Sequence, residues 1–192
     1  MIALFALLSA IIILMAFTPL GYARIGIIEA TLLMIPVAIG AIRMGPTAGG
    51  LLGAVFGLTS FAQCFGISPF GTTLFGISPI STFILTMVPR IAMGVFVALV
   101  YRVLTRSRVE GSHNTFALGI AFFFSALLNT VLFVGFFLIL FGRTEFVREL
   151  QGGATLLAFF ASFVGINGVA EAIIATISGT AIGTALQRAN LM

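Results

Sequence analysis

Long apolar runs make up most of the chain, and short polar or Gly- and Pro-rich breaks separate them. Runs of this length fit helices that cross a membrane, because a bilayer core of about 30 Å needs about 20 apolar residues per helix. Strands of a membrane barrel would instead show alternating segments of about 10 residues. The pattern predicts an all-α integral membrane protein with a single domain over 1–192. We expect six transmembrane helices, at about 2–17, 28–43, 46–63, 80–104, 115–141 and 154–187.

Composition strengthens this assignment, since 60% of the residues are hydrophobic and only 7% are charged, against about 25% charged in soluble domains. The net charge of +4 comes from arginine, because the sequence contains no lysine. Apart from Arg90, the arginines sit at helix ends, and they form no basic stripe, which argues against nucleic-acid binding. One set of predicted helix ends holds Arg43, Arg102, Arg106, Arg108 and Arg188, and the other holds Arg24, Arg143 and Arg148. Because cytoplasmic loops are richer in basic residues, both termini are predicted to be cytoplasmic.

Small residues recur at four-residue spacing in two of the predicted helices. In helix 46–63 and the residue before it, glycines occupy every fourth position from Gly45 to Gly57. Such a face predicts very close packing against another membrane helix. In helix 2–17, Ala6 and Ala10 share a face in the same way. This pair leaves two interpretations open, namely close packing inside the protein or contact with a helix of a partner.

The segment between the third and fourth helices, Gln63–Pro79, carries no charged residue and contains Phe-Gly-Ile-Ser-Pro twice. Glycine and proline break regular structure and supply turns and hinges. An apolar loop that faces water is unusual, so we expect a lid over a cavity or a re-entrant segment; a plain connector is the alternative. In a lid, Phe65, Phe70 and Phe75 would supply the apolar cover.

Four polar side chains interrupt the last three apolar runs. Arg90 lies about ten residues, or roughly 15 Å, from one end of its helix, where an arginine costs at least about 2.5–3.5 kcal/mol. Pro89 removes a backbone donor beside it and frees a carbonyl. By residue counting, Asn129, Asn167 and Glu171 lie at comparable depth, so we expect all four to converge. They form either a structural Arg90–Glu171 pair with asparagine links or the polar floor of a pocket for a small ligand.

Glu29 lies in the first turn of helix 28–43, where it either stabilises the helix N-terminus or lines a ligand pocket. An intramembrane enzyme would need a nucleophile and a base, or a metal cluster, at one depth. No predicted helix holds a histidine, and the acids are too few for a two-metal site. A secondary carrier would normally show repeats with broken helices in both halves, whereas only the helix with Pro89 is broken near its centre.

Several segments, in this order and spacing, resemble the substrate-binding S-components of energy-coupling factor (ECF) vitamin transporters, in particular their pantothenate and riboflavin branch. The likeness covers nearly all of the chain. It rests on Ala6–Ala10, Ala30–Gly40, Gly45-Pro46, Leu52–Ser60, Pro89-Arg90 and Asn167–Ala172. Met34 stands where the pantothenate-type pattern has a histidine, which leaves the vitamin open.

The resemblance implies a high-affinity vitamin-binding subunit, without a cofactor or metal of its own, in the plasma membrane of a prokaryote. Through Ala6 and Ala10 it would dock on a scaffold membrane subunit and then topple to carry its ligand inward. Two ATP-binding subunits would use ATP and Mg²⁺, since this chain has no Gly-x-x-x-x-Gly-Lys-Ser/Thr loop. Pantothenate is the favoured ligand, because its carboxylate suits Arg90 and its hydroxyls and amide suit the asparagines. Riboflavin, cobalamin or another vitamin stays open, and a stand-alone secondary transporter is the further alternative.

Overall fold

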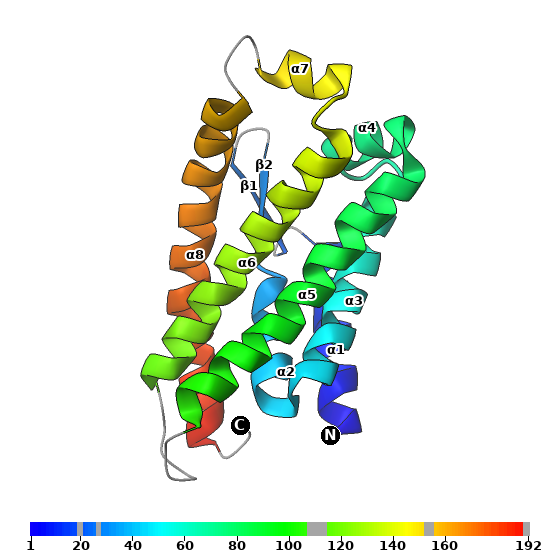
Figure 1. Ribbon diagram of the computed structural model, residues 1–192. Helices are drawn as coiled ribbons and strands as arrows, with labels where there is room; N and C mark the ends of the chain where they lie inside the picture. Colours follow the sequence, from blue (N-terminus) through cyan, green and yellow to red (C-terminus); the bar gives the residue numbers. More distant parts are fainter. Residues whose placement is uncertain (19–20, 26–27, 107–114, 152–155, 190–192) are drawn as a thin grey trace.

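The computed structural model describes residues 1–18, 21–25, 28–106, 115–151 and 156–189, and of these only the backbone at 22–25, 28–30, 151 and 156–167. In these ranges the chain forms eight helices and one antiparallel hairpin (Figure 1). The helices are α1 (Ile2–Ala16), α2 (Met34–Met44), α3 (Pro46–Gln63), α4 (Pro69–Ile77), α5 (Pro79–Thr105), α6 (Thr115–Phe141), α7 (Glu145–Gln151) and α8 (Leu156–Arg188). The strands are β1 (Tyr22–Ile25) and β2 (Ile28–Thr31).

The helices form a bundle in which α5 packs against α3 and α6, and α6 packs against α8 (Figure 1). Helices α4 and α7 lie at one end, whereas the beginning of α1 and the end of α8 lie at the other. Neighbouring helices enclose α2, and its residues Met34–Ala41 are all buried. Leu8 and Ile12 of α1, Phe56 of α3 and Phe122 of α6 belong to the same apolar core as α2.

The helical membrane fold is confirmed in its coarse form. Helices α5 and α6 and the Gly168–Arg188 part of α8 are each long and apolar enough to cross a membrane. Helices α1 and α2 are apolar but shorter. The 11 residues of α2 extend about 16 Å along the axis, which is roughly half of a bilayer core. The number of spans therefore stays a prediction.

The helix predicted at 28–43 is wrong at its beginning, because α2 begins only at Met34. Residues Ile28–Thr31 instead pair with Tyr22–Ile25 as the hairpin. Pro36 explains the late start. A proline ring clashes with the carbonyl four residues earlier and lacks an N–H, so it is accepted only in the first turn of a helix. The preceding β-branched residues are free to form a strand.

The connector predicted at 63–79 contains the helix α4, which the sequence analysis missed. Ser68 and Ser78 are the N-caps of α4 and α5, and their hydroxyls accept hydrogen bonds from the N–H groups of Gly71 and Ser81. A proline follows each cap at the first helical position, where its missing N–H costs nothing. The repeated Ser-Pro pairs are thus two helix starts. Similarly, α7 forms between the two helices predicted at 115–141 and 154–187.

Close packing of the glycine face is confirmed, and the partner helix is α5. A Cβ atom on Gly49 would lie 2.3 Å from the carbonyl oxygen of Gly94, and one on Gly53 would lie 2.2 Å from that of Arg90. A Cβ on Gly57 would lie 2.8 Å from the carbonyl oxygen of Thr86. The two backbones therefore touch where side chains would otherwise separate them.

Candidate ligand-binding site

Arg90 lies in the interior of the bundle, with 8% of its surface exposed. Pro89 stands inside α5 and has no N–H to donate to the carbonyl of Leu85, four residues earlier. The Arg90 Nη1 atom donates to that carbonyl oxygen at 2.8 Å. The expectation that proline frees a carbonyl beside a buried cation is confirmed, and the freed carbonyl fixes one side of the guanidinium.

Two phenylalanine rings from neighbouring helices also contact this guanidinium. Its central carbon lies 4.6 Å from the ring centroid of Phe133 on α6 and 5.4 Å from that of Phe56 on α3. Aromatic faces attract cations, and the weakly hydrated arginine suits such surroundings. Sequence reasoning missed both rings, because 21 phenylalanines give no signal for which of them face Arg90.

Asn129 is placed on α6, one turn before Phe133, with 4% of its surface exposed. Within the ranges that the structure describes, no group donates a hydrogen bond to its Oδ1 atom. An amide oxygen can accept two hydrogen bonds, and a buried acceptor without a partner costs free energy. Asn129 is therefore suited to receive a hydroxyl or amide donor of a ligand.

Glu171 of α8 is buried and already bound by two protein groups. Its Oε1 atom accepts a hydrogen bond from the Thr31 N–H at 2.8 Å, and its Oε2 atom accepts one from the Thr130 hydroxyl at 3.1 Å. It is also close enough to Arg90 for a Coulombic interaction. Glu171 thus ties the end of the hairpin to α6 and α8. The position of Thr130 directly after Asn129 was a signal for this contact that the sequence analysis did not use.

A line of buried polar side chains on α5 leads to Arg90 from the end of the bundle that α4 covers. Thr82 and Thr86 precede Arg90 by two turns and one turn, and both are at most 5% exposed. Their hydroxyls donate to the carbonyls of Ser78 and Phe83. Each hydroxyl oxygen can still accept a hydrogen bond. This face of α5 therefore carries neutral polar groups at Thr82 and Thr86 and a positive charge at Arg90.

For two predicted binding residues, Glu29 and Asn167, the structure describes the backbone but not the side chain. The backbone nevertheless corrects one interpretation. Glu29 pairs with Arg24 in the hairpin, so its predicted role at a helix N-terminus is wrong. For Asn167, the structure gives only that it belongs to α8, one turn before Glu171.

The three phenylalanines of the predicted lid differ in their surroundings. Phe70 of α4 lies 5.6 Å, between ring centroids, from Phe137 of α6. Phe75 lies 5.9 Å from Phe61 of α3 and 4.8 Å from Phe65. Phe65 itself is 62% exposed. Helix α4 is therefore held to the bundle by Phe70 and Phe75 together with the buried Leu74, which belongs to one apolar cluster with Leu85 and Phe137.

Ala6 and Ala10 both lie on the exposed face of α1, whereas Leu8 and Ile12 face the core. The interpretation that the two alanines pack inside the protein is therefore wrong. Their small side chains leave the α1 backbone accessible from outside the bundle, as a closely packed helix from another chain would require.

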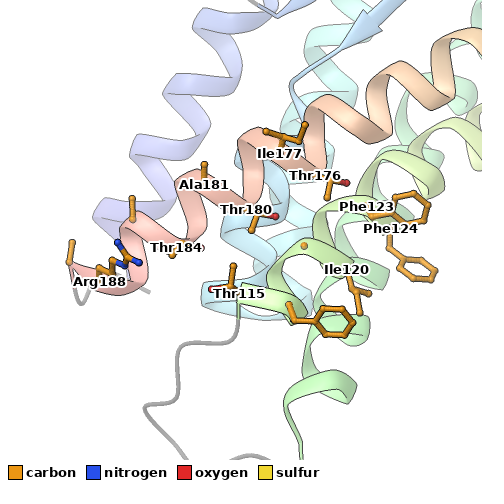
Figure 2. Close-up of a pocket in the computed structure, with 14 residues that line it drawn as sticks. Thr115, Ile120, Phe123, Phe124, Thr176, Ile177, Thr180, Ala181, Thr184 and Arg188 are labelled. Carbon is orange, nitrogen blue, oxygen red and sulfur yellow. The ribbon is translucent and has the colours of Figure 1, made fainter.

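An open groove between α6 and α8 lies away from these residues, at the end of the bundle where α8 ends (Figure 2). Its volume is 1480 Å³, larger than the roughly 300–1,000 Å³ of ordinary small-ligand pockets. Its walls include Phe116, Phe123 and Ile177, with Arg188 at one end. Of the predicted binding residues whose side chains the structure describes, Arg90, Asn129 and Glu171, none lines it, so the groove is separate from these three.

Comparisons with known proteins agree with the geometry. The family model for the substrate-specific component of ECF transporters matches residues 1–183. The chain is 34% identical over 173 residues to the pantothenic acid transporter PanT of Lactococcus lactis, covering 84% of this chain and 80% of that protein. It is 30% identical over 183 residues to the pantothenate transporter PanT of Leuconostoc mesenteroides, covering 94% and 85%.

The family match spans nearly the whole chain, and the chain contains helices long and apolar enough to cross a membrane. The resemblance inferred from the sequence motifs is thereby confirmed. This protein belongs to the family of substrate-specific components of ECF transporters.

Proposed function

We propose that the chain is the pantothenate-binding membrane subunit of an ECF-type importer. The observation that carries this proposal is the buried guanidinium of Arg90 at the end of a polar face on α5. A second buried polar group, the amide oxygen of Asn129 on α6, accepts no hydrogen bond from the residues that the structure describes. Pantothenate combines a carboxylate with hydroxyls and an amide, and these groups match a cation followed by neutral polar groups. The two related proteins named as pantothenate transporters support the same substrate.

In this proposal Arg90 binds the carboxylate through charge-assisted hydrogen bonds. Asn129 accepts a hydrogen bond from the amide or a hydroxyl of the ligand, and Asn167 and Glu29 complete the polar lining. Glu171 acts mainly through the hairpin, because its oxygen atoms already accept bonds from Thr31 and Thr130.

The subunit itself performs no chemical reaction. Its exposed alanine face on α1 binds a scaffold membrane subunit. Two ATP-binding subunits hydrolyse ATP with Mg²⁺, which drives release of the vitamin and returns the subunit to its starting orientation. The exposure of Ala6 and Ala10 supports this contact, and so does membership of the family. Toppling of the loaded subunit in the membrane is the step that would carry the ligand inward.

We further propose six membrane crossings in the plasma membrane of a bacterium, with both termini in the cytoplasm. The beginning of α1 and the end of α8 lie at the same end of the bundle (Figure 1), as an even number of crossings requires. Arg102 and Arg188, at the ends of α5 and α8, also lie there, in agreement with the positive-inside rule. A reporter that is active only in the cytoplasm should therefore give a signal when fused to either terminus, whereas a reporter that is active only outside the cytoplasm should give none.

Calorimetric titration of the purified, ligand-free subunit tests the substrate. Pantothenate should bind tightly with a stoichiometry of one, whereas riboflavin and cobalamin should give no heat of binding. Tight binding of another vitamin, with none for pantothenate, would assign the subunit to a different branch of the family. Weak binding of every vitamin would favour a self-contained carrier.

A further inference from the structure

The main chain at Arg90 is in direct contact with α3 through a single glycine. A Cβ atom on Gly53 would lie 2.2 Å from the Arg90 carbonyl oxygen, 2.8 Å from its carbonyl carbon and 3.0 Å from the Cα atom of Ile91. Ordinary contacts of a Cβ atom begin near 3.4 Å. All three neighbours are backbone atoms, which cannot rotate out of the way as the end of a side chain can. Any side chain at Gly53 would therefore push this part of α5 away from α3 by about 1 Å.

The same stretch of α3 also contacts the guanidinium. Phe56, one turn after Gly53, is fully buried and holds its ring 5.4 Å from the guanidinium carbon. Phe133 contacts the guanidinium from α6 at 4.6 Å. A shift of α5 away from α3 thus moves the guanidinium relative to Phe56 and towards α6. The bonds of a planar guanidinium to a carboxylate depend strongly on such placement.

We propose that Gly53 is a positioning residue for carboxylate recognition, and that its missing side chain sets where Arg90 presents its guanidinium. The inference rests on the proposed function, in which Arg90 binds the carboxylate of pantothenate. Gly53 does not touch the ligand. It acts through the backbone of Arg90, so its substitution should affect the charged end of the ligand and leave the remaining contacts largely intact.

The test compares the binding of pantothenate with that of its neutral alcohol analogue, in which CH₂OH replaces the carboxylate. Gly53→Ala should weaken pantothenate binding at least about tenfold, the lower end of what one hydrogen bond to a charged group contributes. Binding of the alcohol should change by less than about threefold. In an Arg90→Ala background, Gly53→Ala should weaken pantothenate binding no further, because the group that it positions is gone.

Gly135→Ala on α6 is the matched control, because in the part of the chain that the structure describes an added Cβ there meets no atom of another element within 4 Å. It should leave the binding of both ligands unchanged. If Gly53→Ala does not fold, Gly57→Ala is the milder variant, since its nearest atoms, at 2.8 Å, include the flexible Met87 side chain. Gly57→Ala should weaken pantothenate binding less than Gly53→Ala does, and it should again leave binding of the alcohol almost unchanged.

Equal weakening of the acid and the alcohol by the glycine variants would overturn the inference and make this contact purely structural. So would an undiminished effect of Gly53→Ala when Arg90 is absent. Failure of the proposed function gives a different result, since the unmodified subunit would then bind pantothenate no better than the alcohol.

Discussion

At the scale of single residues, Arg90 is held by groups from three helices before any ligand arrives. Its guanidinium donates to the Leu85 carbonyl within α5 and lies between the rings of Phe56 on α3 and Phe133 on α6. A cation fixed in this way loses little freedom when it binds an anion, and preorganisation of this kind raises affinity. The arrangement of Arg90 therefore suits the ligand-binding role that we propose for it.

Replacement of Arg90 tests this explanation. Arg90→Ala should weaken pantothenate binding by about 2–5 kcal/mol, the usual loss when one partner of a buried charge pair is removed. Arg90→Lys should recover only part of the lost binding free energy, because an ammonium group lacks the planar arrangement of donors of a guanidinium. Calorimetric titration measures both variants, with thermal unfolding as the control for folding. An alanine variant that binds normally would mean that Arg90 is structural and that the ligand binds elsewhere.

Pro89→Ala separates the orientation of Arg90 from its charge. Alanine would restore the N–H that the Leu85 carbonyl lacks, and the repaired helix bond would compete with the Arg90 Nη1 donor. We expect pantothenate binding to weaken by roughly 1–2 kcal/mol, while thermal stability stays equal or rises because a helical proline has been removed. Unchanged affinity in the same assay would show that the Leu85 contact does not orient the guanidinium for the ligand.

At the scale of elements, α1 combines two faces with different roles. Leu8 and Ile12 face the core, and Ala6 and Ala10 face outwards. Ala6→Leu or Ala10→Leu should leave vitamin binding intact and abolish uptake, since the larger side chain prevents close approach of a partner helix. Uptake by cells and binding by the purified subunit measure the two effects. Ala181→Leu, on an exposed face of α8, is the matched control and should transport normally. Parallel loss of binding and uptake would instead indicate damage to the fold.

Helix α4 is the element that we expect to move with the ligand. It covers one end of the bundle through Leu74, Phe70 and Phe75. In the connection before it, Gly66, with φ at 108°, occupies a conformation that favours glycine. A spin label at Gly76, where an added Cβ atom meets no other element within 4 Å among the described residues, can be paired with one at the exposed Glu149 of α7. Pantothenate should narrow their distance distribution. The Arg90→Ala variant should show no narrowing. If the distance distribution of the unmodified subunit does not change when ligand is bound, α4 is a rigid cap.

At the scale of the whole molecule, the sequence predicted what depends on long apolar runs and on single costly residues. The helices at 46–63 and 115–141 have the predicted bounds, and Arg90, Asn129 and Glu171 are all buried. The hairpin was missed because short β-branched segments next to an apolar helix have no distinct period. The hairpin contact to Glu171 depends on tertiary packing, as does the pairing of Arg90 with Phe56 and Phe133, and no local pattern predicts either.

Our central proposal is that the bundle holds pantothenate by its carboxylate at Arg90. The most direct measurement is mass spectrometry of the small molecules extracted from the purified subunit and from its Arg90→Ala variant, both produced in cells supplied with the vitamin. We expect about one pantothenate per unmodified subunit and almost none in the folded variant. A different vitamin in the unmodified subunit, or equal amounts of pantothenate in both proteins, would contradict this proposal.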